Sequence, residues 1–214
     1  MKHILLFLTF VLAIGVNGQL TNHQFNLYGK YSYGFNSSSN YHNYGLTGEL
    51  IVHRNFGINY NFDFVDRSDD FRQIHTPMGI VGGPLVIAAG LSNVFDGDST
   101  SSGGLALVGI VLFFLPEGVS FHQNIGYRWD ISPYANLLGI DFIKNRATDE
   151  SWIKYACSFG VRGTYVLKDR VTFSPFIETR KTASVPWGFG GGFAIGVLFG
   201  ERDNNEEEPS VPLE

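Results

Sequence analysis

Residues Phe56 to Val65 read FGINYNFDFV, a stretch in which every second side chain is apolar. The side chains of a β-strand point alternately to the two faces of a sheet, so this period of two predicts a strand with one apolar and one polar face. A length of about ten residues is that of a tilted strand crossing a lipid bilayer. The stretch therefore indicates a strand long enough to span a membrane.

The same alternation recurs along most of the chain. It predicts seven further strands, at residues 26–35, 44–53, 119–129, 132–142, 152–167, 170–180 and 187–199. Tight connections, such as residues 53–55, alternate with longer polar ones, such as residues 144–151. Short inner turns and longer outer loops alternate in this way in membrane barrels. We therefore expect an all-β, antiparallel sheet of eight strands.

The chemistry of the two strand faces indicates the surroundings of this sheet. One face is wide and aromatic, whereas the other carries Gly, Ser, Thr, Asn and charges of both signs. Soluble barrels turn apolar groups inward, and a membrane barrel inverts that arrangement. Charged residues make up 16% of the chain, below the roughly 25% of typical soluble domains. Because an open sheet edge cannot be tolerated in hydrocarbon, we predict a closed transmembrane β-barrel.

The two ends of the chain differ from the strand region. A basic start, Met1-Lys2-His3, precedes the apolar run Ile4–Val16, which predicts a signal peptide at residues 1–18 with cleavage before Gln19. Residues 19–200 are then one barrel domain, and residues 201–214 form an acidic tail. The barrel region is nearly neutral in charge and offers no basic face for nucleic acid.

Residues 67–116 break the alternation between the third and fourth predicted strands. Met78–Leu91 and Gly103–Leu115 are apolar, and each is too short to span a membrane as a helix. We expect two short helices in an insert on the outer side. The alternative is two more strands, ten in total, but residues 93–102 would then form a long connection on the side of the tight turns.

The insert also holds the candidate docking surface. A barrel of this size cannot cover both apolar pieces, and a contiguous exposed apolar patch usually marks an interaction site. The candidate residues are Leu85, Ile87, Val111 and Phe114.

The polar strand faces predict a charge network inside the barrel. Its candidate members are Lys30, Glu49, Asp63, His122, Arg128, Asp141, Lys154, Arg162, Glu178 and Arg180. The interior of an eight-stranded barrel is just wide enough to be filled by side chains, and unpaired buried charge is costly. We interpret the set as a paired structural network rather than an ion path.

Catalysis is the alternative interpretation of the polar face. Ser120 and His122 offer a nucleophile and a base, with Glu49 or Asp63 to orient the base. Residues two apart on a strand point the same way without necessarily touching. The six His are scattered without ligand spacing, and Cys157 is the only Cys. We expect no catalytic residue, no metal and no cofactor.

Three short motifs carry a family resemblance. The stretch LPEGVSFH at residues 115–122, ISPY at 131–134 and FSPF at 173–176 resemble uncharacterised outer-membrane barrels of Bacteroidota-type bacteria. The resemblance implies a location in the bacterial cell outer membrane and supplies no catalytic residue. We expect a non-enzymatic structural or accessory subunit that contacts outer-membrane lipid and another outer-membrane protein. A lipid-modifying enzyme and a narrow pore are the alternatives.

Overall fold

The computed structural model of the protein describes residues 24–53, 55–96, 99–125, 129–167 and 170–200. The strands are β1 (Gln24–Phe35), β2 (Asn40–His53), β3 (Phe56–Arg67), β4 (Phe71–Pro77), β5 (Gly118–Phe121), β6 (Gln123–Ile125), β7 (Trp129–Asn145), β8 (Ser151–Leu167), β9 (Val171–Thr182) and β10 (Gly188–Phe199). A short 3-10 helix, η1 (Met78–Val81), leads into helices α2 (Gly82–Asp96) and α3 (Ser99–Phe113). The predicted signal peptide and acidic tail lie outside the described residues.

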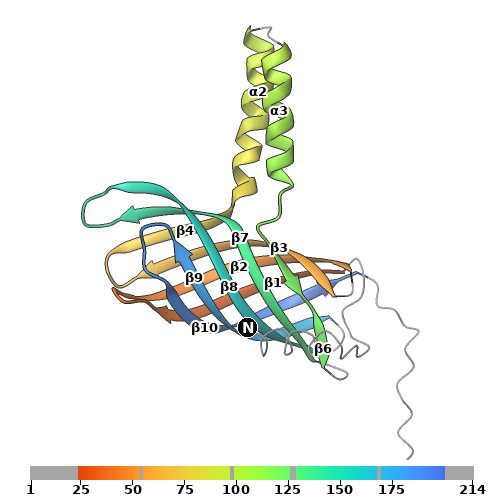
Figure 1. Ribbon diagram of the computed structural model, residues 1–214, viewed down its shortest axis with the longest axis vertical. Coiled ribbons are helices and arrows are strands. Elements are labelled where there is room, and N and C mark those ends of the chain that lie inside the picture. Colours follow the sequence, from red (N-terminus) through yellow and green to blue (C-terminus); the bar gives the residue numbers. More distant parts are fainter. Residues whose placement is uncertain (1–23, 54, 97–98, 126–128, 168–169, 201–214) are drawn as a thin grey trace, which may run out of the picture.

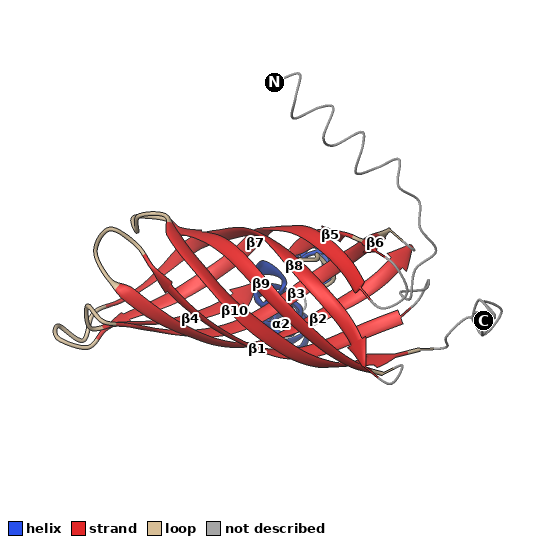
Figure 2. Ribbon diagram, turned by 90° about the horizontal axis from the view of Figure 1, so that it is seen from below, coloured by secondary structure: helices blue, strands red, loops and turns tan. Residues whose placement is uncertain are grey.

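The strands form one antiparallel sheet that closes into a barrel, as Figure 2 shows from the side. β1 pairs with β2 on one edge and with β10 on the other, which joins the first and last strands. From β1 the ring passes through β2, β3, a position shared by β4 and β5, then β7, β8, β9 and β10. The ring therefore has eight strand positions, which confirms the predicted barrel. The ten-stranded alternative is wrong, because the two apolar pieces of the insert are helical.

Apolar and polar side chains are divided between the two faces of the barrel wall as the sequence predicted. In β3, Phe62 and Phe64 are 47% and 40% exposed, whereas Asn61 and Asp63 between and beside them are 4% and 5% exposed. The aromatic side chains therefore point outward and the polar ones fill the interior. Only a surrounding hydrocarbon layer makes this arrangement favourable.

The fourth position in the ring is built from two half-strands. β4 pairs with residues 63–66 of β3 and residues 139–145 of β7. β5 pairs with residues 56–59 of β3 and residues 134–136 of β7. The chain leaves the wall after Pro77 and returns at Pro116, so the insert interrupts a strand halfway along its length.

The insert is consequently shorter than predicted, and it lies elsewhere. Residues 67–116 were expected to leave the barrel on the outer side, but Arg67 ends β3 and residues 71–77 form β4. Figure 1 shows that α2 and α3 project away from the barrel wall, crosswise to the long axis of the barrel. Figure 2 places them near the middle of the barrel's length. We call these two helices, together with Phe114 directly after α3, the hairpin.

The two helices of the hairpin pack closely through glycine. A Cβ atom added at Gly82 would lie 2.3 Å from the carbonyl oxygen of Gly109, and one added at Gly109 would lie 2.9 Å from that of Gly82. Backbones this close leave no room for larger side chains, as in many helix pairs within membranes. Within the described residues, neither helix is both long and apolar enough to cross a membrane.

Candidate functional site

The inner half of the lumen holds a cluster centred on Arg162 and Glu49. Nη2 of Arg162, on β8, lies 2.6 Å from each carboxylate oxygen of Glu49, on β2. The guanidinium also stacks over the ring of Tyr28, with its central carbon 4.7 Å from the ring centroid. Both charged side chains are almost fully buried, so each depends on the other to offset its loss of solvation.

Ser120, His122 and Asp130 extend this cluster. The Ser120 hydroxyl donates to Glu49 over 2.6 Å and lies 3.2 Å from Nε2 of His122. Nδ1 of His122 lies 3.0 Å from Asp130. We refer to Glu49, Ser120, His122, Asp130 and Arg162 as the inner cluster.

The other half of the lumen holds a second cluster, which begins at Asp63. Its carboxylate accepts Lys30 at 2.9 Å and Arg180 at 3.2 Å. Arg180 also donates to Asp141 over 2.7 Å, and the Thr182 hydroxyl donates to the same carboxylate. The chain of contacts joins strands β1, β3, β7 and β9 across the lumen.

His75 links this second cluster to the break in the wall. Its Nδ1 lies 2.7 Å from Asp141 and its Nε2 lies 2.7 Å from Glu117. The ring can donate to both carboxylates only when both of its nitrogens carry hydrogen. The side-chain amide of Asn43 lies 3.3 Å from Asp63 and 3.5 Å from Glu178, so it links Glu178 to this group. We refer to Lys30, Asp63, His75, Glu117, Asp141, Glu178 and Arg180 as the outer cluster.

Glu117 closes the gap between β4 and β5. Its backbone N–H donates to Asn59 over 3.0 Å, and its carbonyl accepts the N–H groups of Leu137 and Leu138 at 2.9 Å each. Its carboxylate accepts the backbone N–H of Asn61 at 2.7 Å and the Asn61 side-chain amide at 2.9 Å. Backbone groups in a membrane must be satisfied within the protein, and Glu117 supplies the partners that a continuous fourth strand would have offered.

Most of the predicted interior residues lie in these two clusters. Lys30, Glu49, Asp63, His122, Asp141, Arg162, Glu178 and Arg180 all face the lumen. Lys154 is only partly buried and stands apart at the loop end, and Arg128 lies outside the described residues.

Three members of the clusters were not predicted from the sequence, namely His75, Glu117 and Asp130. His75 and Glu117 belong to the segment without clear alternation, and Asp130 fell between the predicted strands 119–129 and 132–142, although it lies in β7. The polar residues Gln73 and His75, two apart and both buried, carried the period of two that could have revealed β4.

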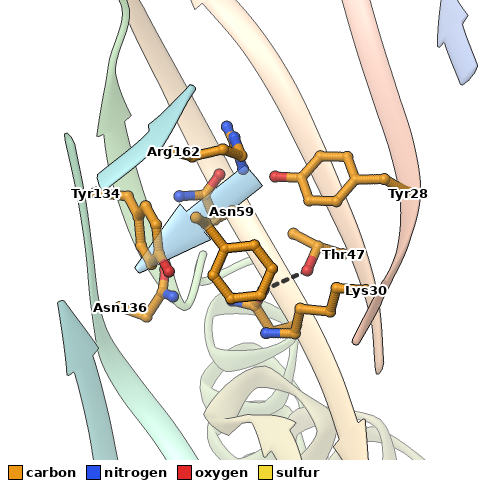
Figure 3. A pocket seen from close by; sticks show the side chains of 9 residues that line it. Tyr28, Lys30, Thr47, Asn59, Tyr134, Asn136 and Arg162 are labelled. Carbon is orange, nitrogen blue, oxygen red and sulfur yellow. Dashed lines mark hydrogen bonds between the residues drawn. The ribbon is translucent and has the colours of Figure 1, made fainter. Parts of the chain in front are cut away.

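Ser120, His122 and Asp130 contact one another in the same order as the serine, histidine and aspartate of a hydrolytic triad, but the likeness ends there. Asp130 contacts Nδ1 of His122, while Glu49, an expected orienter, lies on the Nε2 side and accepts the hydrogen bond from the Ser120 hydroxyl. Ser120 and His122 are at most 1% exposed. The neighbouring cavity, shown in Figure 3 between Tyr28, Lys30, Asn59 and Arg162, holds about 20 Å³, the space of a single water. This cavity is too small to hold a substrate.

The rim at the loop end carries exposed ion pairs. Lys144 lies 2.7 Å from Asp149, which sits in the loop between β7 and β8 with a φ of 60°. The hydrogen bond from Lys144, together with its charge, lowers the pKa of the exposed Asp149 carboxyl. Surface pairs of this kind contribute little to stability, so the rim is held mainly by its backbone contacts.

Comparison with known proteins gives a likeness of fold. No protein-family model and no curated protein matches the chain. The N-terminal β-barrel domain of OprF from Pseudomonas aeruginosa has a TM-score of 0.54 at 8% identity, over 84% of this chain and 100% of that one. Neisserial surface protein A has a TM-score of 0.48 at 8% identity (82% and 94% covered), and OprG of Pseudomonas aeruginosa one of 0.46 at 8% identity (86% and 99% covered).

The fold and its outward aromatic belt together define the class of protein. The chain is a small transmembrane β-barrel with the architecture of outer-membrane proteins. Single-chain barrels with lipid-facing aromatic walls belong to the bacterial outer membrane, and that is the location of this protein. The more specific resemblance to barrels of Bacteroidota-type bacteria stays a prediction.

Proposed function

We propose that this protein is a non-enzymatic structural or accessory subunit of an outer-membrane complex, with the hairpin as its docking element. The observation that carries the proposal is the place where the hairpin leaves the barrel. It emerges halfway along the wall, at the depth where the outward side chains meet hydrocarbon. A helix pair at that depth is presented to whatever lies beside the barrel in the bilayer.

The surface chemistry of the hairpin supports a partner within the membrane. Ile87, Val111 and Phe114, three of the predicted docking residues, are 64%, 59% and 70% exposed, while Leu85 is half-buried. Among the α3 side chains whose exposure the structure describes, Leu107, Val108, Ile110, Val111 and Phe113 are exposed, whereas Gly109 is buried against α2. Apolar side chains exposed away from the partner helix are a feature of helices surrounded by lipid or by other membrane segments. With 15 residues in each helix, the hairpin reaches about 22 Å from the wall.

The filled lumen supports the non-enzymatic part of the proposal. Within each cluster the charged groups form ion pairs, except Glu178, whose carboxylate accepts hydrogen bonds from Ser32, Asn43 and Tyr134. The cavity between the two clusters has room for one water. This part of the interior stabilises the barrel, and the space between the two clusters is too small for a substrate or a hydrated ion.

A charge placed on the hairpin is expected to remove the partner and leave the barrel intact. Val111→Asp or Phe114→Asp puts a carboxylate at a depth where it costs roughly 2.5–3.5 kcal/mol, so the hairpin can no longer occupy the hydrocarbon layer. We expect the amount of co-purifying membrane protein in mild detergent to fall by about tenfold or more.

Two controls accompany this experiment. Val111→Leu and Phe114→Leu keep the apolar surface and should retain the partner. Heat-dependent gel mobility reports barrel folding and should be the same for all four variants, because neither residue belongs to a barrel strand. An aspartate variant that kept its partner, or that failed to form a barrel, would contradict the proposal.

A further inference from the structure

The loop end of the barrel contains a cavity that neither cluster uses. It encloses about 350 Å³ and opens at the mouth between β3, β4, β7 and β8. Small-molecule sites in proteins occupy about 300–1,000 Å³, so the cavity lies at the small end of that range. Among its lining residues, Gln73 and Ile143 are buried, and each is two positions along its strand from a member of the outer cluster, His75 and Asp141.

The walls of this cavity are largely apolar. The rings of Phe71 and Trp152 lie 6.2 Å apart between centroids, inclined at 42°. Val185 and Pro186, from the loop between β9 and β10, also line the cavity. A flat apolar group fits between walls of this composition.

Charge within the cavity is uneven. Arg67 is neutralised by Asp69, since Nε and Nη2 of the guanidinium lie 2.9 Å and 2.5 Å from its two carboxylate oxygens. Lys154 also lines the cavity and forms no ion pair with any of the residues that the structure describes. Among the described lining residues, Lys154 therefore supplies the uncompensated charge.

The loop that covers the cavity is held in place by the barrel. The ammonium of Lys181 donates to the carbonyl of Val185 over 2.6 Å, and the N–H of Val185 donates to the carbonyl of Thr182. The N–H of Ala183 donates to the carbonyl of Tyr155 on the neighbouring strand. A wall fixed before binding reduces the ordering cost that a ligand must offset.

We propose that this mouth cavity binds a small amphipathic anion from outside the cell. The ligand class is an aromatic carboxylate, with its ring against Phe71, Trp152 and Pro186. Its carboxylate pairs with Lys154. The site is independent of the hairpin, so a ligand here and a partner there can be tested separately.

The proposal is tested with 2-naphthoate as the probe and 2-naphthamide as its neutral counterpart. The full chain is reconstituted in lipid nanodiscs, and binding is followed by calorimetry and by tryptophan fluorescence, with empty nanodiscs as the blank. We expect saturable binding of the naphthoate and binding of the amide that is about tenfold weaker, because an ion-paired carboxylate contributes more than a neutral hydrogen bond.

Variants assign the binding to the cavity. Lys154→Gln should remove the preference for the anion, and Lys154→Arg should retain it. Trp152→Ala should weaken both probes, and it provides the second measurement if the Lys154 variants fail to fold. Lys144→Gln is the matched control, since Lys144 is a cation at the same rim, already paired with Asp149, and does not line the cavity.

Three results would overturn the assignment. The first is equal affinity for the acid and the amide in the unaltered chain. The second is unchanged binding in Lys154→Gln together with Trp152→Ala. The third is binding to empty nanodiscs as strong as to the protein, which would show partition into lipid only.

Discussion

Replacing Arg162 by glutamine is expected to lower the free energy of unfolding by about 3 kcal/mol, the lower end of what is lost when one partner of a buried ion pair is removed. Glu49 is 1% exposed, and its two carboxylate oxygens each lie 2.6 Å from the guanidinium. Without Arg162 this carboxylate keeps the Ser120 hydroxyl and the His122 ring, but it loses its only arginine partner among the described residues. The value is measured by denaturant unfolding in lipid, followed by tryptophan fluorescence.

The matched control for this experiment is the pair of substitutions made together. Glu49→Gln with Arg162→Gln removes both charges, so the double variant should be more stable than Arg162→Gln alone. Planar-bilayer recordings should show no new conductance in either variant, since the interior remains filled. A large ion current with unchanged stability would instead identify the lumen as a pore and contradict the structural interpretation of the network.

The second large effect is expected at the break in the barrel wall. Glu117→Ala removes the acceptor for the backbone N–H of Asn61, for the Asn61 side chain and for His75. Each buried donor left without a partner costs about 1–3 kcal/mol, so the total loss should be roughly 3 kcal/mol or more. The loss should also be local, because the gap between β4 and β5 lies at this point.

Hydrogen exchange of backbone amides separates this local effect from general destabilisation. Exchange in the peptide containing Tyr60 and Asn61 should become faster in Glu117→Ala than exchange in β8 and β9. Glu117→Gln keeps a carbonyl acceptor for Asn61, so its exchange rates near Asn61 should remain close to those of the unaltered chain. Uniform acceleration across all strands, or no change near Asn61, would show that Glu117 does not close the gap.

The sequence predicted those parts of the barrel wall in which the strands are long and have one apolar and one polar face. In β3 four aromatic rings alternate with polar side chains. The lipid outside the barrel requires an apolar side chain at every second position across the full thickness of the bilayer. β4 has seven residues, and Ile74 is the exposed apolar side chain at its centre, so its alternation is too short to stand out. The helices were recognised by composition, but nothing in their sequence indicates that they interrupt a strand.

The sequence predicted most of the residues of the candidate site, but it did not predict which of them pair with each other. A period of two assigns Glu49 and Arg162 to the inner face, yet the two residues are 113 positions apart and meet across the lumen. Which residues pair depends on the stagger of β2 against β8 around the ring, and no local pattern encodes that stagger. His75 and Glu117 needed the split of the fourth strand to be known first.

The hairpin has a consequence for how this protein sits among its neighbours. A plain barrel presents a similar apolar belt in every direction, so it can rotate about the membrane normal without changing its contacts. An arm of about 22 Å on one side removes that equivalence and gives the barrel a front and a back within the membrane plane. The arm also sets a minimum spacing on one flank, so that neighbouring proteins can touch the wall directly only on the other flanks.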